Sequence, residues 1–466
     1  MKSYIILVLT IIGLIAPQFA LLSQQIPERR LTWIPGFNER NTFWQRYFTR
    51  FPATHHIRQD QSVNSDHQSN MNLTNLSTTV GAPLNGYNNE PLLAQPIGIG
   101  HSMGGLLSRD IDRQWTGQAR KFCAIITVGT PNSGAFAVNA VQSGMVEQAF
   151  MRATRAVALG PAYDVTSGAA DLLFTGNFAA GLVSGVTSII GGQEVIDYIG
   201  KTIWNDNLHG FIQNVNTAPA SEMAVGNARM SQFGAPNVPT ISIWGNEDGP
   251  MIYRMATVAS RRNDIPNDPM DFSTDTKYVD WANSAASVYH AAAYAHGVYS
   301  MVSGLWGIIT LNPAGVAAAA YHAVAADAYS TGRSYIKWDA ENDYRRIIGA
   351  TWVETIKTLP DYRVYNFRTK TWTKLPRLDD IEEPDMKESR EMWNMDSYTL
   401  VYRTHNDAAD AFIPVTSQNA IPLLTASYQA IGAGHLEQGN HVEVRRRFED
   451  IFTRQNNLEY FTPKRQ

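Results

Sequence analysis

The stretch that decides the fold is PIGIGHSMGGLL, residues 96–107. Ile97 and Ile99 give its first part the apolar character of a buried strand, and an amphipathic helical pattern, GGLLSRDIDRQW, follows the pentapeptide GHSMG. A strand that runs into such a turn and a helix that runs out of it lift the central serine above the edge of a sheet. The pentapeptide alone would also fit an ordinary glycine-rich turn, but this context predicts that Ser102 is a nucleophile.

An earlier strand and turn can supply one of the backbone N–H donors that stabilise the oxyanion formed when such a serine attacks an ester. Residues 31–34 are typical of a strand, and the turn PGF follows at 35–37. Acyl transfer through serine needs two preorganised backbone N–H donors, one after the nucleophile and one after an early strand. Met103 and Phe37 occupy these places, so we expect them to form the oxyanion hole. A simple strand-ending turn is the alternative interpretation of PGF.

Between and beyond these turns the pattern is mixed. Residues 57–90 are rich in Asn, Ser and Thr, which predicts an irregular loop with one short helix. Three histidines in and just before this stretch, His55, His56 and His67, have no recurring ligand spacing and no cysteine beside them. We therefore expect neither a metal nor a cofactor. The apolar run at 122–128 predicts a strand, and its turn, GTPNSG, lies at the same sheet edge as Ser102.

The motifs PGF, GHSMGGLLSR and ITVGTPNSG, in this order, resemble the lipase and esterase branch of the α/β-hydrolases. Pro35 departs from the pattern, because relatives usually have histidine there. The resemblance covers residues 30–136 and resumes at 239–245 and 405–452. It implies an α/β-hydrolase fold, with a mostly parallel sheet and helices on both faces, a Ser-His-acid triad and ester hydrolysis.

Three aspartates compete for the acid position of the triad. THNDAADAFIPV resembles the relatives' DGxVP segment, with Asp410 at the acid position and Ala411 in place of the usual glycine. Asp248, in WGNEDGP, also follows a predicted core strand and fits the acid position of many relatives. Asp407 is a third alternative. We favour Asp410 because of its DGxVP-like context.

Two histidines compete for the role of general base. A predicted strand at 428–431 and a glycine-containing turn lead into His435, while His441 precedes an acidic helix as in some lipases. We favour His435, because the end of a strand can present an imidazole to the serine. It would accept the Ser102 proton and return it to the leaving group, while Asp410 would fix its tautomer.

The N-terminus predicts export. Residues 1–23 carry Lys2, an apolar run and a looser stretch that ends in a small residue, which is typical of a secretory signal peptide. An uncleaved membrane anchor is the alternative. We therefore expect a secreted or cell-envelope protein. Its one cysteine, Cys123, cannot form an internal disulfide and is expected to be structural.

Two insertions interrupt the predicted core. We assign the hydrolase core to residues 24–136, 238–249 and 401–466, and the insertions to 137–237 and 250–400. Both insertions are expected to be helical and rich in Ala and Gly, and the second is broken at Pro313. The uncharged stretch 172–192 predicts a buried or lid helix rather than a spanning one. The second insertion is interpreted either as a fixed cap or as a mobile lid whose apolar face meets lipid.

Composition limits the function. Hydrophobic residues make up 44% of the chain, charged residues 17%, and the net charge of −4 gives no reason to expect nucleic-acid binding. We predict a secreted serine hydrolase of carboxylic esters with apolar acyl groups, whose substrate is a small-molecule or lipid ester and which contacts a membrane or lipid surface. The alternatives are a serine amidase or peptidase on the same fold and a catalytically idle hydrolase fold used for binding.

Overall fold

The computed structural model describes part of the 466-residue chain, namely residues 29–37, 39, 41–44, 47, 57–62, 71–87, 91–145, 148, 217–247, 249–254, 257, 276–309, 313–358, 363–366, 371–374, 399–453 and 460–461. The predicted signal peptide, the stretch 172–192, the three loop histidines and Asp248 lie outside the described residues. The chain divides into two compact units, Met1–Gly349 with Ala408–Gln466, and Ala350–Asp407.

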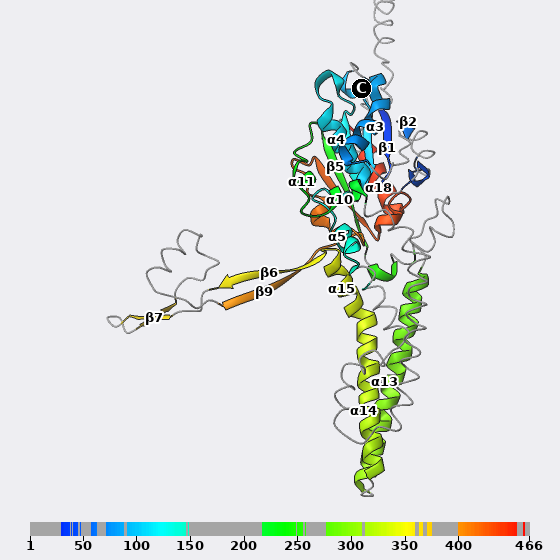
Figure 1. Cartoon of the computed structure of the whole chain (residues 1–466), viewed down its shortest axis with the longest axis vertical. Coiled ribbons are helices and arrows are strands. Elements are labelled where there is room, and N and C mark those ends of the chain that lie inside the picture. The colour runs from blue at the N-terminus through cyan, green and yellow to red at the C-terminus, as the bar shows by residue number, and fades with distance from the viewer. Residues whose placement is uncertain are drawn as a thin grey trace, which may run out of the picture. The chain divides into compact units, whose positions relative to one another are not determined.

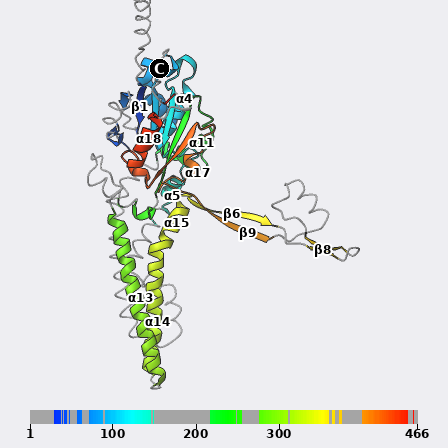
Figure 2. The same cartoon turned by 180° about the vertical axis from the view of Figure 1, so that it is seen from behind.

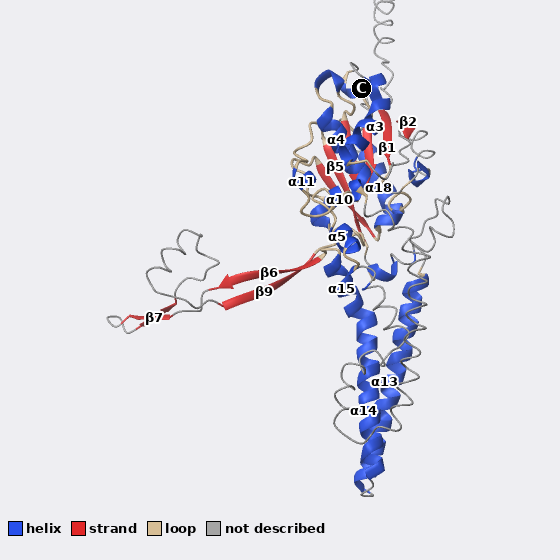
Figure 3. Cartoon of the chain, in the orientation of Figure 1, coloured by secondary structure: helices blue, strands red, loops and turns tan. Residues whose placement is uncertain are grey.

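The first unit contains a six-stranded sheet in the order β10-β5-β4-β3-β1-β2 (Figures 1 and 3). Every neighbouring pair is parallel. The strands are β1 (Arg29–Ile34), β2 (Ile57–Ser62), β3 (Ile97–His101), β4 (Ala124–Val128), β5 (Thr240–Asn246) and β10 (Ala426–Ile431). All residues of β3 and β4 are buried, as expected for short apolar strands covered on both faces.

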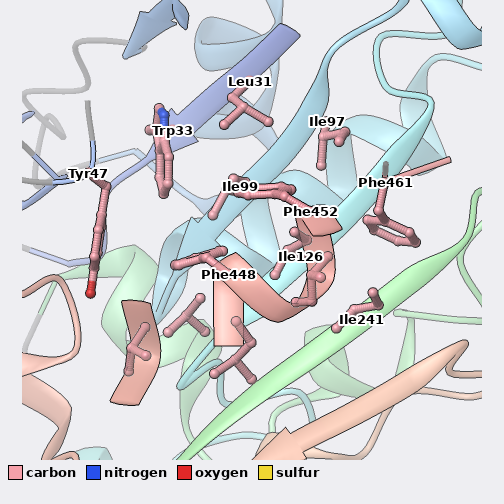
Figure 4. Packing of buried hydrophobic residues seen from close by; sticks show 14 of the residues in the cluster. Leu31, Trp33, Tyr47, Ile97, Ile99, Ile126, Ile241, Phe448, Phe452 and Phe461 are labelled. Carbon is pink, nitrogen blue, oxygen red and sulfur yellow. The ribbon is translucent and has the colours of Figure 1, made fainter. Parts of the chain in front are cut away.

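Helices cover both faces, because successive strand residues point to opposite sides. On one face, Phe448 and Phe452 of α18 (Val442–Thr453) pack on Trp33, Ile99 and other strand residues (Figure 4). On the other face, α3 (Leu73–Gly81), α4 (Met103–Gln114), α10 (Ala218–Met223) and α11 (Ala228–Ser231) contribute to a second apolar cluster. The predicted α/β class, with a parallel sheet between helical layers, is confirmed.

Shorter helices complete the connections of the first unit. They are η1 (Asn41–Trp44), η2 (Ala82–Tyr87), η3 (Leu92–Ala94), η4 (Gly117–Ala119), α5 (Phe136–Gln142), α17 (Val415–Gln418) and η9 (His435–Glu437). Cys123 is fully buried just before β4, and burial raises the pKa of its thiol to about 11. The thiol is therefore uncharged at neutral pH, which suits a structural role.

One expectation for the first half of the chain is wrong. Residues 57–62 form the edge strand β2, paired with β1, and not an irregular loop. Their sequence, IRQDQS, lacks the apolar alternation that identifies a strand, so pairing with β1 decides the conformation.

A long helical hairpin follows the core strand β5. The helices α13 (Lys277–Ile309) and α14 (Pro313–Ser334) lie side by side in both views (Figures 1 and 2). The break at Pro313 falls where the sequence predicts it, because proline is compatible with the first turn of a helix but not with its interior. A π-helical turn, η7 (Tyr335–Asp339), and α15 (Ala340–Ile347) continue the chain.

The second unit consists of strands. β6 (Thr351–Thr358) pairs antiparallel with β9 (Thr399–Asn406), and β7 (Arg363–Asn366) pairs antiparallel with β8 (Thr371–Lys374). The prediction of a helical insertion over 250–400 is therefore wrong for β6, β7 and β8, and the predicted start of the last core segment at 401 falls inside β9. TWVETIKT and TLVYRTHN are rich in β-branched and aromatic residues, which favour strands.

Candidate active site

Ser102 stands on a strained turn between β3 and α4. Its φ is 50° and its ψ is −123°, a backbone region that residues other than glycine rarely adopt. The N–H of Ser102 donates to the carbonyl of Val128 at 2.9 Å, and the N–H of Gly105 donates to the carbonyl of Ser102 at 3.1 Å. The turn is thus held by the neighbouring strand and by its own helix, as a nucleophile elbow requires.

The two glycines of the pentapeptide allow close backbone approach. A Cβ at Gly100 would collide with the backbone of Gly104 and Gly105, and a Cβ at Gly104 would collide with the carbonyl oxygen of Ile34. The first glycine lets the chain reverse sharply, and the second lets α4 begin directly against the chain that leaves β1.

His435 bridges Ser102 and Asp410. Its Nε2 lies 3.0 Å from Ser102 Oγ, and its Nδ1 lies 2.8 Å from Asp410 Oδ2. His435 begins η9, shortly after β10, and both side chains of the His–Asp pair are almost fully buried. The structure therefore brings together the three residues that the sequence favours for a triad.

The Asp410 carboxylate is fully buried, and both of its oxygens accept hydrogen bonds. Its Oδ1 accepts from the N–H groups of Phe412 and Ile413 at 3.1 and 2.8 Å, and its Oδ2 accepts from Gln438 Nε2 at 2.9 Å. In addition, the N–H of His435 donates to the Asp410 carbonyl at 2.7 Å. These bonds fix the carboxylate in the position from which it orients the imidazole.

The turn after Asp410 puts the next residue in a conformation that favours glycine. Ala411 has a φ of 72°, the left-handed region that favours glycine. The hydroxyl of Tyr344, in α15, donates to the Ala411 carbonyl at 2.8 Å. Burial raises the pKa of Tyr344 well above its ordinary value, so the phenol stays a donor. This bond stabilises a turn that alanine would otherwise disfavour.

The segment that carries His435 is anchored by a buried ion pair. Arg254 donates to Glu437 at 2.8 Å and lies 3.4 Å from Glu247. Burial raises the pKa of Glu437 to about 7, although Arg254 opposes that shift. The pair fixes η9 to the chain that follows β5.

The alternative residues have other positions. His441 precedes α18, where its Nδ1 accepts from the N–H of Glu443 at 3.2 Å. Asp407 belongs to the second unit, and its N–H donates to the Ala350 carbonyl at 2.7 Å. The third alternative, Asp248, lies outside the described residues.

The two expected oxyanion donors belong to turns at the same edge. Met103 opens α4 directly after Ser102 and is buried. Phe37 follows Gly36, where an added Cβ would lie only 2.9 Å from the Cβ of Ser102. The turn after β1 therefore lies directly against the serine.

Two side chains near Ser102, those of Glu39 and His101, were not among the predicted site residues. Glu39 Oε2 accepts from the N–H of Gly36 at 2.5 Å and lies 2.8 Å from His101 Nδ1. Burial lowers the pKa of His101, although Glu39 opposes that shift, so we assign a neutral ring that donates from Nδ1. The position of His101 next to Ser102 was a signal in the sequence, but nothing indicated its partner.

A cavity of about 590 Å³ opens beyond the end of β5, and its lining includes Tyr253, Trp338 and Glu341. None of Ser102, Asp410 and His435 is among the residues that line it. Burial raises the pKa of Glu341 to about 7, against the effect of Arg345. Within the described part of the chain, no group of three or more His, Cys, Asp or Glu side chains could hold a metal ion.

The strand order, the strained serine between β3 and α4, and the later Asp410 and His435 define the α/β-hydrolase fold. No protein-family model and no curated protein matches the chain. The chain is similar to three solved α/β structures at low identity.

The first is Est816, an N-acyl homoserine lactone degrading enzyme, with 12% identity over 52% of this chain and 82% of that one, at a TM-score of 0.25. A novel epoxide hydrolase from metagenomes of hot environments has 16% identity over 48% of this chain and 76% of that one, at a TM-score of 0.24. Bacillus megaterium epoxide hydrolase, solved with an inhibitor, has 12% identity over 47% of this chain and 77% of that one, at a TM-score of 0.20.

Proposed function

We propose that this protein is a serine hydrolase that cleaves carboxylic esters through an acyl-enzyme. The observation that carries the proposal is the hydrogen-bonded series Ser102–His435–Asp410, with distances of 3.0 and 2.8 Å, on a serine with positive φ. Strain at such a position persists only where the surrounding structure maintains it, and it is concentrated at functional sites.

The mechanism follows from this geometry. Ser102 Oγ attacks the ester carbonyl carbon while its proton passes to His435 Nε2, and Asp410 stabilises the imidazolium that forms. The N–H groups of Phe37 and Met103 stabilise the negative oxygen of the tetrahedral intermediate. The alcohol leaves with the proton from His435. Water then attacks the acyl-enzyme by the same proton transfers and releases the acid and free Ser102.

The composition of the helical hairpin is an argument for apolar, lipid-like substrates. Residues 281–326 contain no Asp, Glu, Lys or Arg. Eleven large apolar side chains are exposed along the two helices, namely Val288, Tyr294, Val298, Tyr299, Met301, Val302, Leu305, Ile309, Val316, Tyr321 and Val324. A helix pair without a charged face is unsuited to water on all sides.

Two polar contacts join the two helices. His296 Nδ1 is 2.8 Å from His322 Nδ1, and the hydroxyl of Ser300 donates to the Ala319 carbonyl at 2.8 Å. Polar contacts and small residues inside, with apolar side chains outside, are typical of helix pairs in a lipid medium. We therefore propose that the hairpin contacts a lipid surface. Among the described residues, no helix has the length and apolar character needed to cross a membrane.

A panel of p-nitrophenyl esters of rising chain length, beside matched anilides, tests this function. We expect ester hydrolysis that improves with acyl length, because each buried CH₂ contributes about 0.8 kcal/mol. A preference for anilides would favour the amidase alternative. Activity on neither class, from folded protein, would favour a binding role for the fold.

The lipid contact is tested with a long-chain ester on both sides of its solubility limit. An abrupt rise in rate at aggregation would support contact with a lipid surface. A smooth saturating curve, with acetate as the best ester, would indicate an esterase for small dissolved substrates.

A further inference from the structure

We propose that Glu39 and His101 are positioning residues that hold the oxyanion-binding turn against the nucleophile. This inference rests on the proposed ester hydrolysis, and it concerns how the site is kept in register.

The sheet fixes only where the two donor turns begin. β1 and β3 are parallel neighbours, with Ile34 opposite Gly100, so the turns after them start at the same level. Residues 35–37 then leave the sheet, and the ladder no longer restrains them. Pro35 has no N–H to donate to the ladder. Contacts outside the ladder therefore determine where the N–H of Phe37 lies.

The turn has little space in which to move toward the serine. An added Cβ at Gly36 would lie 2.9 Å from the Ser102 Cβ, and one at Gly104 would collide with the Ile34 carbonyl. The backbones are thus already in contact on this side. A further contact is needed to prevent the turn from moving away from Ser102.

Glu39 supplies that restraint. One carboxylate oxygen, Oε2, receives both the N–H of Gly36 at 2.5 Å and Nδ1 of His101 at 2.8 Å. His101 is the residue directly before Ser102, so a single atom joins the turn after β1 to the elbow after β3. Glu39 is 5% exposed and His101 is fully buried, so water competes little for these bonds.

The His101 ring cannot shift independently of the site. It stacks on Phe43 with ring centroids 4.4 Å apart and lies 4.7 Å from the His435 ring. A carboxylate bonded to such a ring is held in place on both sides of the turn. Losing it would let Phe37 drift, and a displacement of about 1 Å in a catalytic group can cost roughly 100-fold in rate.

The decisive variant is Glu39→Ala in the full-length protein, assayed with a p-nitrophenyl ester. We expect kcat to fall about 10- to 100-fold while KM stays within about twofold, because the loss concerns the transition state. Glu39→Gln keeps an acceptor oxygen and should recover most of kcat. The matched control is Asp112→Ala. Asp112 is an equally buried carboxylate, on α4, that accepts from the N–H of Asn237 at 2.6 Å, and its loss should lower the melting temperature but not kcat.

A second variant covers the case in which Glu39→Ala does not fold. His101→Phe keeps a ring between Phe43 and His435 but removes the donor to Glu39, so it should show the same loss in kcat. The inference is overturned if folded His101→Phe or Glu39→Ala retains the wild-type kcat, or if KM rises while kcat does not change. Failure of the proposed function has a different signature, since the wild-type protein itself would then hydrolyse no ester.

Discussion

The sheet edge around Ser102 and the helical hairpin 277–334 place polar and apolar groups in opposite ways. At the sheet edge, Trp33 and Phe448 are fully buried, and the buried Asp410 carboxylate accepts hydrogen bonds from neighbouring groups. In the hairpin, Tyr294 and Ile309 are 73% and 75% exposed, while His296 faces the partner helix. One region is built to keep water from a small polar site, and the other presents apolar surface outward. Substitutions at the edge should therefore change chemistry, and substitutions in the hairpin should change surface association.

The largest expected effect is that of Ser102→Ala. Without the nucleophilic oxygen, kcat/KM for a soluble p-nitrophenyl ester should fall by about 10⁴-fold or more. The melting temperature should stay the same or rise, because the φ of 50° remains and only one oxygen is lost. Retained turnover at an unchanged melting temperature would show that Ser102 is not the nucleophile.

Asp410→Asn should have the next largest effect. Loss of the carboxylate leaves His435 in the wrong tautomer, and we expect a loss in kcat of about 10³- to 10⁴-fold. The comparison variant is Asp248→Asn, for which we expect less than about a tenfold change. The reverse ranking would transfer the acid role to Asp248.

The hairpin prediction separates surface association from chemistry. The double variant Val302→Lys with Leu305→Lys adds charge to two exposed apolar positions and should lower binding to phosphatidylcholine vesicles at least tenfold. Hydrolysis of a dissolved butyrate ester should be unchanged. Leu423→Lys, at another exposed apolar position outside the hairpin, is the control. Equal vesicle binding by the double variant and the wild type would contradict the proposed lipid contact.

The smallest effect is a change in the pH dependence of stability. The pKa of Glu341 is raised to about 7 in the folded protein, mainly by burial. Because its pKa is raised on folding, Glu341 contributes fully to the free energy of unfolding when the pH is below its ordinary pKa. That contribution is lost as the pH rises through about 7. Glu341→Gln should therefore flatten the fall in melting temperature between pH 5 and 8. Because Glu437 has a similarly raised pKa, part of the fall should remain. An unchanged slope would show that Glu341 titrates normally.

The sequence predicted those parts of the site that short segments encode. The elbow depends on a strand, two glycines and a helix within twelve residues, and Asp410 and His435 each follow a recognisable turn. Local pattern could not reveal β2, because a polar edge strand depends on its partner for its conformation. Nor could it predict the Glu39–His101 bond, which joins residues 62 positions apart. The ribbon of β6 and β9 was missed because a helical pattern before it was extended too far.

The most direct test of the proposed mechanism is covalent labelling by a p-nitrophenyl alkylphosphonate. Ser102 Oγ should form a bond to phosphorus and release one p-nitrophenolate per chain, because the tetrahedral phosphonate mimics the transition state of acyl transfer. We expect a single adduct, located by mass spectrometry on the peptide that contains Ser102, with ester hydrolysis lost in proportion to labelling. An adduct on a different residue, or undiminished hydrolysis after Ser102 is labelled, would contradict it.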